Sequence, residues 1–129
     1  MKILLLGKNG QLDRELQRSL APLGELIALD CHCQDFCGDL TNLQGLAATV
    51  QAERPDSIIN AAAYTAVDKA ESELDLARTI NALAPGMLAQ EAQKLGARLV
   101  HHYTDYEFDG SVSQPWLETE TPAPLDVYG

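Results

Sequence analysis

The chain has 129 residues and a formal net charge of −10, with 9 Lys and Arg against 19 Asp and Glu. One domain of ordinary globular composition is expected, since 46% of the residues are hydrophobic and 22% are charged, and disordered and fibrous classes are excluded. Nucleic acid and anionic membranes are poor partners for an acidic chain without a basic cluster.

The location expected from the sequence is the cytoplasm. The apolar run at 3–6 is too short for a signal peptide, and no segment reaches membrane-spanning length. Cys31, Cys33 and Cys37 are odd in number and crowded together, which is not the disulfide pattern of a secreted domain. A metal site around Cys31-His32-Cys33 is the alternative, but the spacing is not that of a zinc knuckle. We therefore predict incidental thiols and no metal site.

The predicted elements alternate between strands and helices. The aliphatic run at 3–6 predicts a strand buried on both faces. Leu12, Leu16 and Leu20 recur every four positions and predict the buried stripe of a helix over 10–21. The next elements are a strand over 26–29, a helix opened by a capping box at Thr41 and Gln44, a strand over 57–60, a helix over 74–95 kinked at Pro85, and a strand over 98–102. A turn at 109–110, a loop over 114–124 and the start of a further helix near the end follow.

Strict alternation of strands and helices predicts an α/β fold with a doubly wound parallel sheet, because parallel neighbours need crossover connections. The first connection is Gly7-Lys8-Asn9-Gly10. Glycine at its two ends permits a tight turn and close backbone approach, so that the amides of the helix N-terminus can hold a pyrophosphate. Asp30 follows Gly7 by 23 positions, at the end of the second strand, where a carboxylate accepts hydrogen bonds from an adenosine ribose. Nucleotide binding is the prediction, and a purely structural turn is the alternative.

Several stretches together resemble the extended short-chain dehydrogenase/reductases and, within them, the dTDP-4-dehydrorhamnose reductase family. They are residues 7–11, 37–41, 60–71, 81–82, 104–106, 108–110 and 126–129. The resemblance implies a Rossmann-like fold, NADPH or NADH as cofactor, and reduction of the 4-keto group of a dTDP-linked deoxysugar to give dTDP-L-rhamnose. It also implies a homodimer, with magnesium at a dimer contact near Glu15; a solvated helix surface is the simpler interpretation of that residue.

The resemblance assigns roles to individual residues. Thr104 and Tyr128 would be catalytic, since carbonyl reduction needs a hydroxyl on the substrate oxygen and a proton for the developing alkoxide. The cofactor would be bound by Gly7, Asn9, Gly10, Gln11 and Leu12 at the pyrophosphate, by Asp30 at the ribose, by Asp39 and Leu40 on the adenine side, and by Ala61, Ala62, Ala63 and Tyr64 along the remaining wall.

In that family a lysine follows the tyrosine by one helical turn, which lies three positions beyond Gly129, and a substrate-binding half follows. Residues 1–129 are therefore expected to be one incomplete NAD(P)-binding domain with little turnover alone. A catalytically inactive nucleotide-binding or regulatory module, or a degenerate fragment, is the alternative. An epimerase or dehydratase of the same superfamily is disfavoured by residues 126–129.

Three residues depart from the family pattern. Asp13 replaces the third glycine of the loop; facing the phosphates at roughly 6 to 8 Å, it would repel each charge by about 2 to 3 kcal/mol, whereas facing solvent it would be mildly favourable. Tyr103 replaces a serine and would crowd the nicotinamide pocket. Glu107 replaces an apolar residue and is expected to be a buried, unpaired carboxylate.

Three further features remain, of which the last two keep two interpretations each. His101 and His102 are expected to be structural. The charged cluster of Asp68, Lys69 and Glu71 is either a helix start with local ion pairs or part of the cofactor entrance. Trp116 is either a lid over the substrate or an anchor for its loop.

Overall fold

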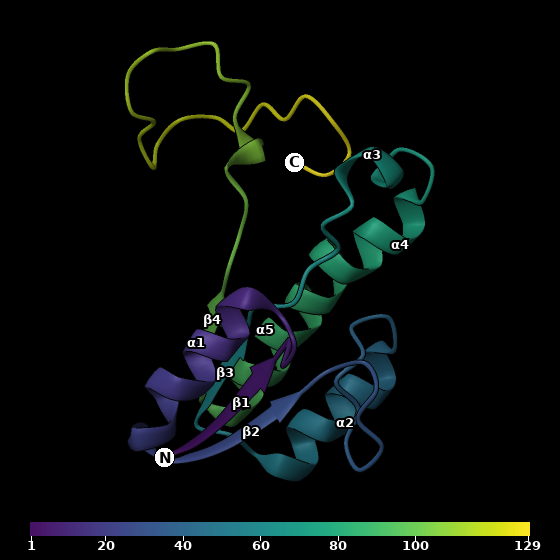
Figure 1. Ribbon diagram of the computed structural model, residues 1–129, viewed down its shortest axis with the longest axis vertical. Helices are drawn as coiled ribbons and strands as arrows, with labels where there is room; N and C mark the ends of the chain where they lie inside the picture. The colour runs from purple at the N-terminus through teal and green to yellow at the C-terminus, as the bar shows by residue number, and fades with distance from the viewer.

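Four strands form one parallel sheet in the order β2-β1-β3-β4 in the computed structural model, which describes residues 1–129 (Figure 1). The strands are β1 (Lys2–Leu6), β2 (Glu25–Leu29), β3 (Ser57–Asn60) and β4 (Arg98–His101). Ile3 of β1 pairs with Leu26 on one side and with Ser57 on the other, and Ser57 pairs with Arg98. The predicted parallel α/β fold is confirmed.

Central strand β1 explains why both faces of the sheet are covered. Its side chains alternate between two apolar clusters: Leu4 and Leu6 belong to the larger one, and Ile3 and Leu5 to the smaller one. All four are fully buried. A strand that is apolar at every position needs helices on both sides of the sheet.

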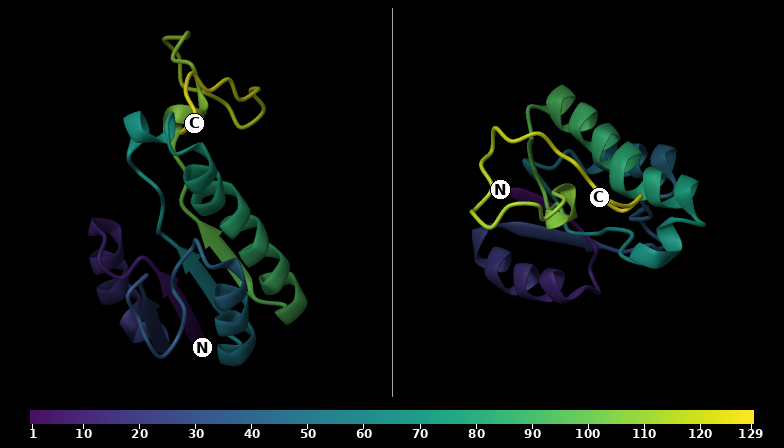
Figure 2. Two further views of the ribbon diagram at one scale, coloured as in Figure 1. Left: turned by 90° about the vertical axis from the view of Figure 1, so that its right-hand side faces the viewer. Right: turned by 90° about the horizontal axis from the view of Figure 1, so that it is seen from above.

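The longer helices supply this cover. Helix α1 (Gln11–Leu20) packs on one face, and α2 (Leu43–Glu53) with α5 (Ala84–Leu95) packs on the other (Figure 2). The shorter elements are the 3₁₀ turns η1 (Ala21–Leu23) and η3 (Asp105–Glu107), the helices α3 (Val67–Ala70) and α4 (Leu74–Arg78), and the π-turn η2 (Thr79–Leu83). No helix is both long and apolar enough to cross a membrane.

The buried face of α1 differs from the predicted one. Leu16 and Leu20 pack against the smaller apolar cluster as expected, but Leu12 is 42% exposed and Asp13 is 2% exposed. Positions 13, 16 and 20 are separated by three and four residues, which is the spacing of one helical face. The prediction that Leu12 is buried was therefore wrong, and a carboxylate occupies the inward position.

Helix α2 begins one residue later than the predicted capping box implies. Asn42 is the N-cap, and its side chain accepts a hydrogen bond from the backbone N–H of Gly45. Thr41 lies one residue before the N-cap, and its hydroxyl donates to the Asp39 carboxylate, at 2.7 Å. The predicted pairing of Thr41 with Gln44 was wrong.

The long helix predicted over 74–95 is present as α4, η2 and α5 in succession. Its irregularity at Pro85 takes the form of the π-turn, in which the N–H of Ala84 bonds to the carbonyl of Thr79. Proline lacks the N–H that would bond to the carbonyl of Asn81, and its ring crowds that carbonyl. A wider turn just before the proline accommodates both effects.

The segment after β4 lies above the carboxyl ends of the strands and returns toward α3 (Figure 1). Trp116 stacks on Phe108 at 4.5 Å between ring centroids, which supports its interpretation as a loop anchor. Residues 125–127 form a bend, so the helix expected near the end is not formed. Glu107 is half-buried, and the expectation of a fully buried carboxylate was wrong because Glu107 lies in a short surface 3₁₀ turn.

Candidate nucleotide-binding and catalytic site

The loop between β1 and α1 is shaped by Gly7. Gly7 has φ +111°, a conformation that side-chain-bearing residues rarely adopt. A Cβ atom there would also stand 3.0 Å from the backbone nitrogen of Ala62, so β1 and the segment after β3 approach closely only because residue 7 is glycine. The carbonyl of Gly7 accepts a hydrogen bond from the N–H of Gly10, which closes the turn at 2.9 Å.

Gly10 is the N-cap of α1 and has no capping side chain. The first N–H groups of a helix have no partner within the helix, and here no side-chain cap satisfies them. These donors, together with the positive end of the helix dipole, form an anion-binding site of the kind that holds phosphates. The loop therefore fits a pyrophosphate through backbone groups.

A cavity of about 630 Å³ opens over this loop at the carboxyl ends of β1, β2 and β3. It brings together eleven of the twelve predicted cofactor residues, which are Gly7, Asn9, Gly10, Gln11, Leu12, Asp30, Asp39, Leu40, Ala61, Ala62 and Ala63. No Lys or Arg lines this nucleotide cavity. The backbone amides at the N-terminus of α1 are therefore its main anion-binding groups.

Asp30 is oriented by three neighbours. The side-chain amide of Asn9 and the backbone N–H of His32 donate to its carboxylate, the latter at 2.8 Å, and the Cys33 thiol lies at 3.5 Å. The His32 N–H holds the pKa of the Asp30 carboxyl below its ordinary value. An ionised acceptor consequently stands at the end of β2, as a ribose site requires.

Tyr64 is the one predicted cofactor residue that does not line the nucleotide cavity. Its hydroxyl donates to Glu73, and this bond raises the pKa of Tyr64 to about 12. Its backbone is held by the Asn81 side chain, which accepts from the Tyr64 N–H at 2.8 Å and donates to the Tyr64 carbonyl at 3.0 Å. Tyr64 therefore faces α4, and its predicted contact with a cofactor rests on backbone atoms alone.

Thr104 and Tyr128 both line a second cavity of about 330 Å³, which we call the catalytic cavity. Ala61 and Ala63 line both cavities, so the two spaces adjoin along the segment after β3. The Thr104 hydroxyl accepts from the N–H of Tyr106 at 3.2 Å, which leaves its own proton available to a ligand. The Tyr106 ring packs edge-on against Tyr128 at 5.4 Å.

Two residues of the catalytic cavity were missed by sequence reasoning. Arg78 is the only Lys or Arg that lines either cavity, and Asn81 lies three positions after it on the same side of the helix. The three-residue spacing of Arg78 and Asn81 was the feature of the sequence that could have placed both side chains on the same side of the helix. Tyr103 also lines the catalytic cavity; it is 63% exposed, and its hydroxyl lies 3.4 Å from the carbonyl oxygen of Gly129.

His101, the last residue of β4, and His102, directly after it, line the catalytic cavity as well. His101 contacts the side-chain amide of the fully buried Asn60 at 3.1 Å, and burial lowers the pKa of His101. His102 lies within 3.4 Å of the carbonyl oxygen of Asn60. Both histidines thus contact β3, which agrees with a structural role.

Asp13 faces inward, directly beside the loop. Its Oδ1 atom is buried without a hydrogen-bond partner. Burial raises the pKa of the Asp13 carboxyl. Its own backbone N–H and the charge of His102 lower the pKa by a smaller amount, so that the net shift is upward. The sequence left open whether this carboxylate faces solvent or the phosphate site, and the structure places it in the lining of the nucleotide cavity.

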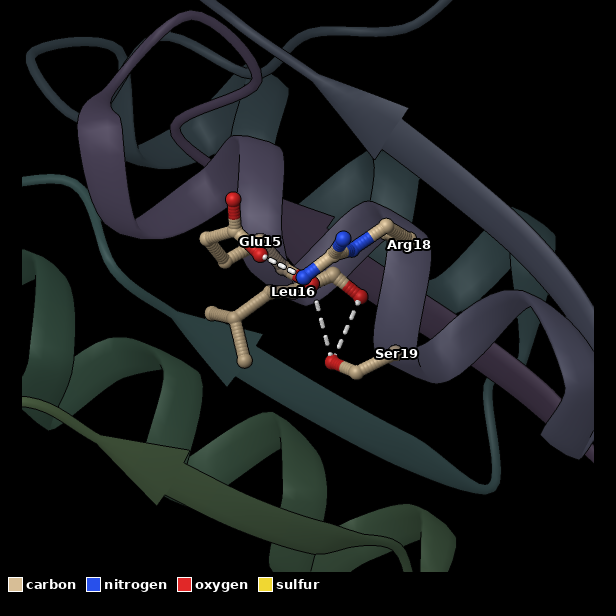
Figure 3. A network of polar contacts seen from close by, with 4 residues as sticks. All are labelled: Glu15, Leu16, Arg18 and Ser19. Atoms are coloured by element: carbon tan, nitrogen blue, oxygen red, sulfur yellow. Dashed lines mark hydrogen bonds and ion pairs between the residues drawn. The ribbon is translucent and has the colours of Figure 1, made fainter.

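The solvent face of α1 carries Glu15, which pairs with Arg18 at 2.5 Å (Figure 3). Both side chains are mostly exposed, and the Ser19 hydroxyl bonds to the backbone carbonyls of Glu15 and Leu16. No group of three or more His, Cys, Asp or Glu residues is arranged to hold a metal ion, and the three cysteines are free thiols. The magnesium predicted at a dimer contact near Glu15 stays a prediction, because such a site would need a second copy of the chain.

The charged cluster of Asp68 and Lys69 in α3 and Glu71 at its C-terminal end contributes one contact to the site. The Glu71 carboxylate accepts from the backbone N–H of Val127 at 3.0 Å. This bond holds the segment that carries Tyr128 against α3. Neither Asp68 nor Lys69 forms an ion pair, so the interpretation as a helix start with local ion pairs is not supported.

Comparison with known proteins decides the family. Residues 1–129 match the family described as the RmlD substrate binding domain. The chain belongs to this family. It is 57% identical over 129 residues to a dTDP-4-dehydrorhamnose reductase of Escherichia coli K12, a match that covers all of this chain and 43% of the relative. The resemblance inferred from the sequence motifs is confirmed.

Solved structures of the same family superpose closely. A dTDP-4-dehydrorhamnose reductase from Clostridium acetobutylicum has a TM-score of 0.90 at 43% identity, covering 100% of this chain and 45% of that one. One from Bacillus anthracis, in complex with NADP, has a TM-score of 0.88 at 39% identity, covering 98% and 44%. The chain thus spans less than half the length of these family members.

Proposed function

We propose that residues 1–129 form the cofactor-binding domain of an NAD(P)H-dependent reductase that converts dTDP-4-dehydro-L-rhamnose to dTDP-L-rhamnose. One observation carries this proposal. The nucleotide cavity over the glycine loop adjoins, through Ala61 and Ala63, the catalytic cavity that contains Thr104 and Tyr128. In open α/β sheets, dinucleotides bind outside the carboxyl ends of the strands, which is where both cavities lie.

Different residues of the nucleotide cavity bind different parts of the cofactor. The N-terminal amides of α1 hold the pyrophosphate, and the ionised Asp30 accepts hydrogen bonds from the adenosine ribose. Gly38 allows the chain to pass close to Asp30, since a Cβ atom there would stand 2.6 Å from the Asp30 carbonyl oxygen. This contact keeps the adenine side of the cavity, with Asp39 and Leu40, adjacent to Asp30.

NAD(P)H, when bound, supplies the hydride for the substrate carbon. Thr104 donates a hydrogen bond from its free hydroxyl proton to the substrate carbonyl oxygen. Tyr128 gives its phenolic proton to the same oxygen as negative charge develops there, and this completes the alcohol. Edge-on packing against Tyr106 restricts the Tyr128 ring, and the Glu71 contact restricts its backbone.

A second candidate is a nucleotide-binding module without turnover. Two observations favour it: Asp13 places a carboxylate in the anion site, and the bulky Tyr103 lines the catalytic cavity. In this case the chain binds a nucleotide but reduces no carbonyl. A cytoplasmic location and a homodimer are predictions common to both candidates.

A chimera separates the two. The chain is joined to the C-terminal remainder of the Escherichia coli relative, and NADH and NADPH oxidation is followed with dTDP-4-dehydro-L-rhamnose. Turnover that falls about 100-fold or more in Tyr128→Phe while cofactor affinity is retained supports the reductase. A folded chimera that binds cofactor without turnover, even after Tyr103→Ser, supports the binding module. A folded chimera that binds neither cofactor contradicts both.

A further inference from the structure

Asp13 is a buried carboxyl group that lines the nucleotide cavity, and the proposed reductase reaction gives it no role. It is 2% exposed, and its Oδ1 atom has no hydrogen-bond partner. A Cβ atom on Gly7 would stand 2.7 Å from Oδ2 and 2.9 Å from Oδ1, and a Cβ atom on Gly10 would stand 2.5 Å from Oδ2. The carboxyl group therefore fills the space beside both glycines of the loop.

No cationic side chain in the nucleotide cavity offsets this carboxyl group. The cavity is lined by two further carboxylates, Asp30 and Asp39, and by no Lys or Arg. His102, just after β4, lowers the pKa of Asp13 through its charge, and this partly offsets the increase that burial causes. Other titratable or charged groups on the surrounding elements are all exposed: Lys8 in the loop, Arg14, Glu15 and Arg18 on α1, and Cys31 and His32 after β2.

We propose that Asp13 makes dinucleotide binding proton-linked: the loop accepts a pyrophosphate when the Asp13 carboxyl is neutral and resists it when the carboxyl is ionised. The proposal rests on the nucleotide site of the proposed function. A neutral carboxyl group can donate its proton to a phosphate oxygen, whereas a carboxylate beside the same anion repels it, and the burial of Asp13 limits the screening of that repulsion. Burial, which already disfavours the ionised form, makes the neutral form accessible.

The direction of the pH dependence follows from linkage. A bound pyrophosphate disfavours ionisation of Asp13 further, so its pKa is higher in the complex than in the free protein. Binding takes up protons between these two pKa values, up to one per chain. Affinity is highest and constant below the lower value, weakens by at most tenfold for each pH unit between them, and is constant again above the higher value.

Calorimetric titration with NAD⁺ tests this. NAD⁺ is the suitable probe because it lacks the 2′-phosphate of NADP⁺, which itself titrates near neutral pH. Titrations from about pH 5 to about pH 9, in two buffers of different ionisation enthalpy, give both the Kd and the number of protons taken up. We expect the Kd of the unmodified chain to rise about tenfold or more over this range, with net proton uptake on binding.

Two variants sharpen the experiment. Asp13→Asn keeps the shape but cannot ionise, so its Kd is expected to be constant with pH and close to the acid-limit Kd of the unmodified chain. Glu15→Gln removes an exposed carboxylate two residues away on the same helix and should keep the original pH dependence. Circular dichroism of each variant confirms that it is folded, and Asp13→Gly serves as the second variant if Asp13→Asn is not.

The outcomes are distinguishable. A pH-independent Kd in the unmodified chain, without proton uptake, overturns the proton linkage and leaves dinucleotide binding standing. The same pH dependence in Asp13→Asn overturns it too, because the titrating group is then not Asp13. If neither folded protein binds NAD⁺ at any pH, the nucleotide site of the proposed function fails, and the linkage fails with it.

Discussion

The Asp13 carboxylate lies against Gly10, so closely that a Cβ atom at Gly10 would stand 2.5 Å from Oδ2. The same carboxylate is buried, and one of its oxygens has no partner. A helix that packs its first turn against a sheet normally places a small or apolar residue at this point. In this chain the loop glycines provide the space that the carboxyl group occupies. The free energy of unfolding of the domain therefore depends on whether Asp13 is ionised.

Replacing Asp13 by asparagine should stabilise the domain at neutral pH. The amide retains the shape without the cost of burying an unpaired charge, and we expect the free energy of unfolding at pH 7 to rise by about 1 to 3 kcal/mol. Because the folded-state pKa of Asp13 is raised, the native chain binds more protons than the unfolded chain between the two pKa values. Stability of the unmodified chain therefore falls as pH rises through the folded pKa.

Urea unfolding of both proteins at several pH values measures this effect. The difference between Asp13→Asn and the unmodified chain should be largest at neutral pH and should shrink in acid, where Asp13 is protonated. Glu15→Gln is the control and should follow the unmodified chain, since Glu15 is exposed. An Asp13→Asn variant less stable than the unmodified chain at neutral pH contradicts the argument.

The two loop glycines should respond differently to alanine. Gly10→Ala meets only the Oδ2 atom of Asp13 closely, so the double variant Gly10→Ala/Asp13→Ala should recover most of the lost stability. Gly7→Ala is strained by φ +111° and by the Ala62 backbone nitrogen at 3.0 Å, so Asp13→Ala should not rescue it. We expect each single variant to lose about 1 to 3 kcal/mol. Equal rescue of both, measured by urea unfolding, would contradict this distinction.

The sequence predicted the parts of the fold that follow from local pattern. The continuous apolar run of β1 predicted a strand covered on both faces, and it is one. Eleven of the cofactor residues that the family resemblance implied line one cavity, at the edge where parallel strands gather the residues after their carboxyl ends. That these residues lie together follows from the parallel order of the strands, which the alternation of strands and helices predicted.

The failures arose where long-range contacts decide between local options. A count of leucines in α1 placed Leu12 inside, but the packing of Leu16 and Leu20 on the sheet rotates Asp13 inward instead. Thr41 fitted a capping box, yet the helix begins one residue later, with Asn42 as its N-cap. The orientation of Tyr64 depends on Glu73, nine positions away, and no periodicity reports such a contact.

The chain should bind NADH more tightly than NADPH. Asp30 is held ionised at the end of β2, and no Lys or Arg lines the nucleotide cavity to neutralise a 2′-phosphate. Asp30→Ala should weaken NADH binding about tenfold, through loss of charge-assisted hydrogen bonds, and should affect NADPH less. Fluorescence titration with both cofactors checks the ratio; a preference for NADPH in the unmodified chain would contradict this interpretation of Asp30.

Asn81 should act on both cavities as a positioning residue. Its side chain holds the N–H and the carbonyl of Tyr64 at 2.8 and 3.0 Å, and residues on either side of Tyr64 line the cavities. In Asn81→Ala, both backbone groups lose their partner, which should cost about 1 to 2 kcal/mol of stability. The loosened segment should also weaken dinucleotide binding about threefold to tenfold.

A matched amide elsewhere shows whether the binding effect of Asn81→Ala is specific. Gln51 on α2 donates to Glu91 on α5 at 3.0 Å, and neither residue lines the nucleotide cavity or the catalytic cavity. Gln51→Ala should lower stability by removing one hydrogen bond but leave the Kd for NADH unchanged. If both variants weaken NADH binding equally, the loss reflects general destabilisation. A loss confined to Asn81→Ala means that the π-turn, through this one side chain, sets the position of the wall shared by the two cavities.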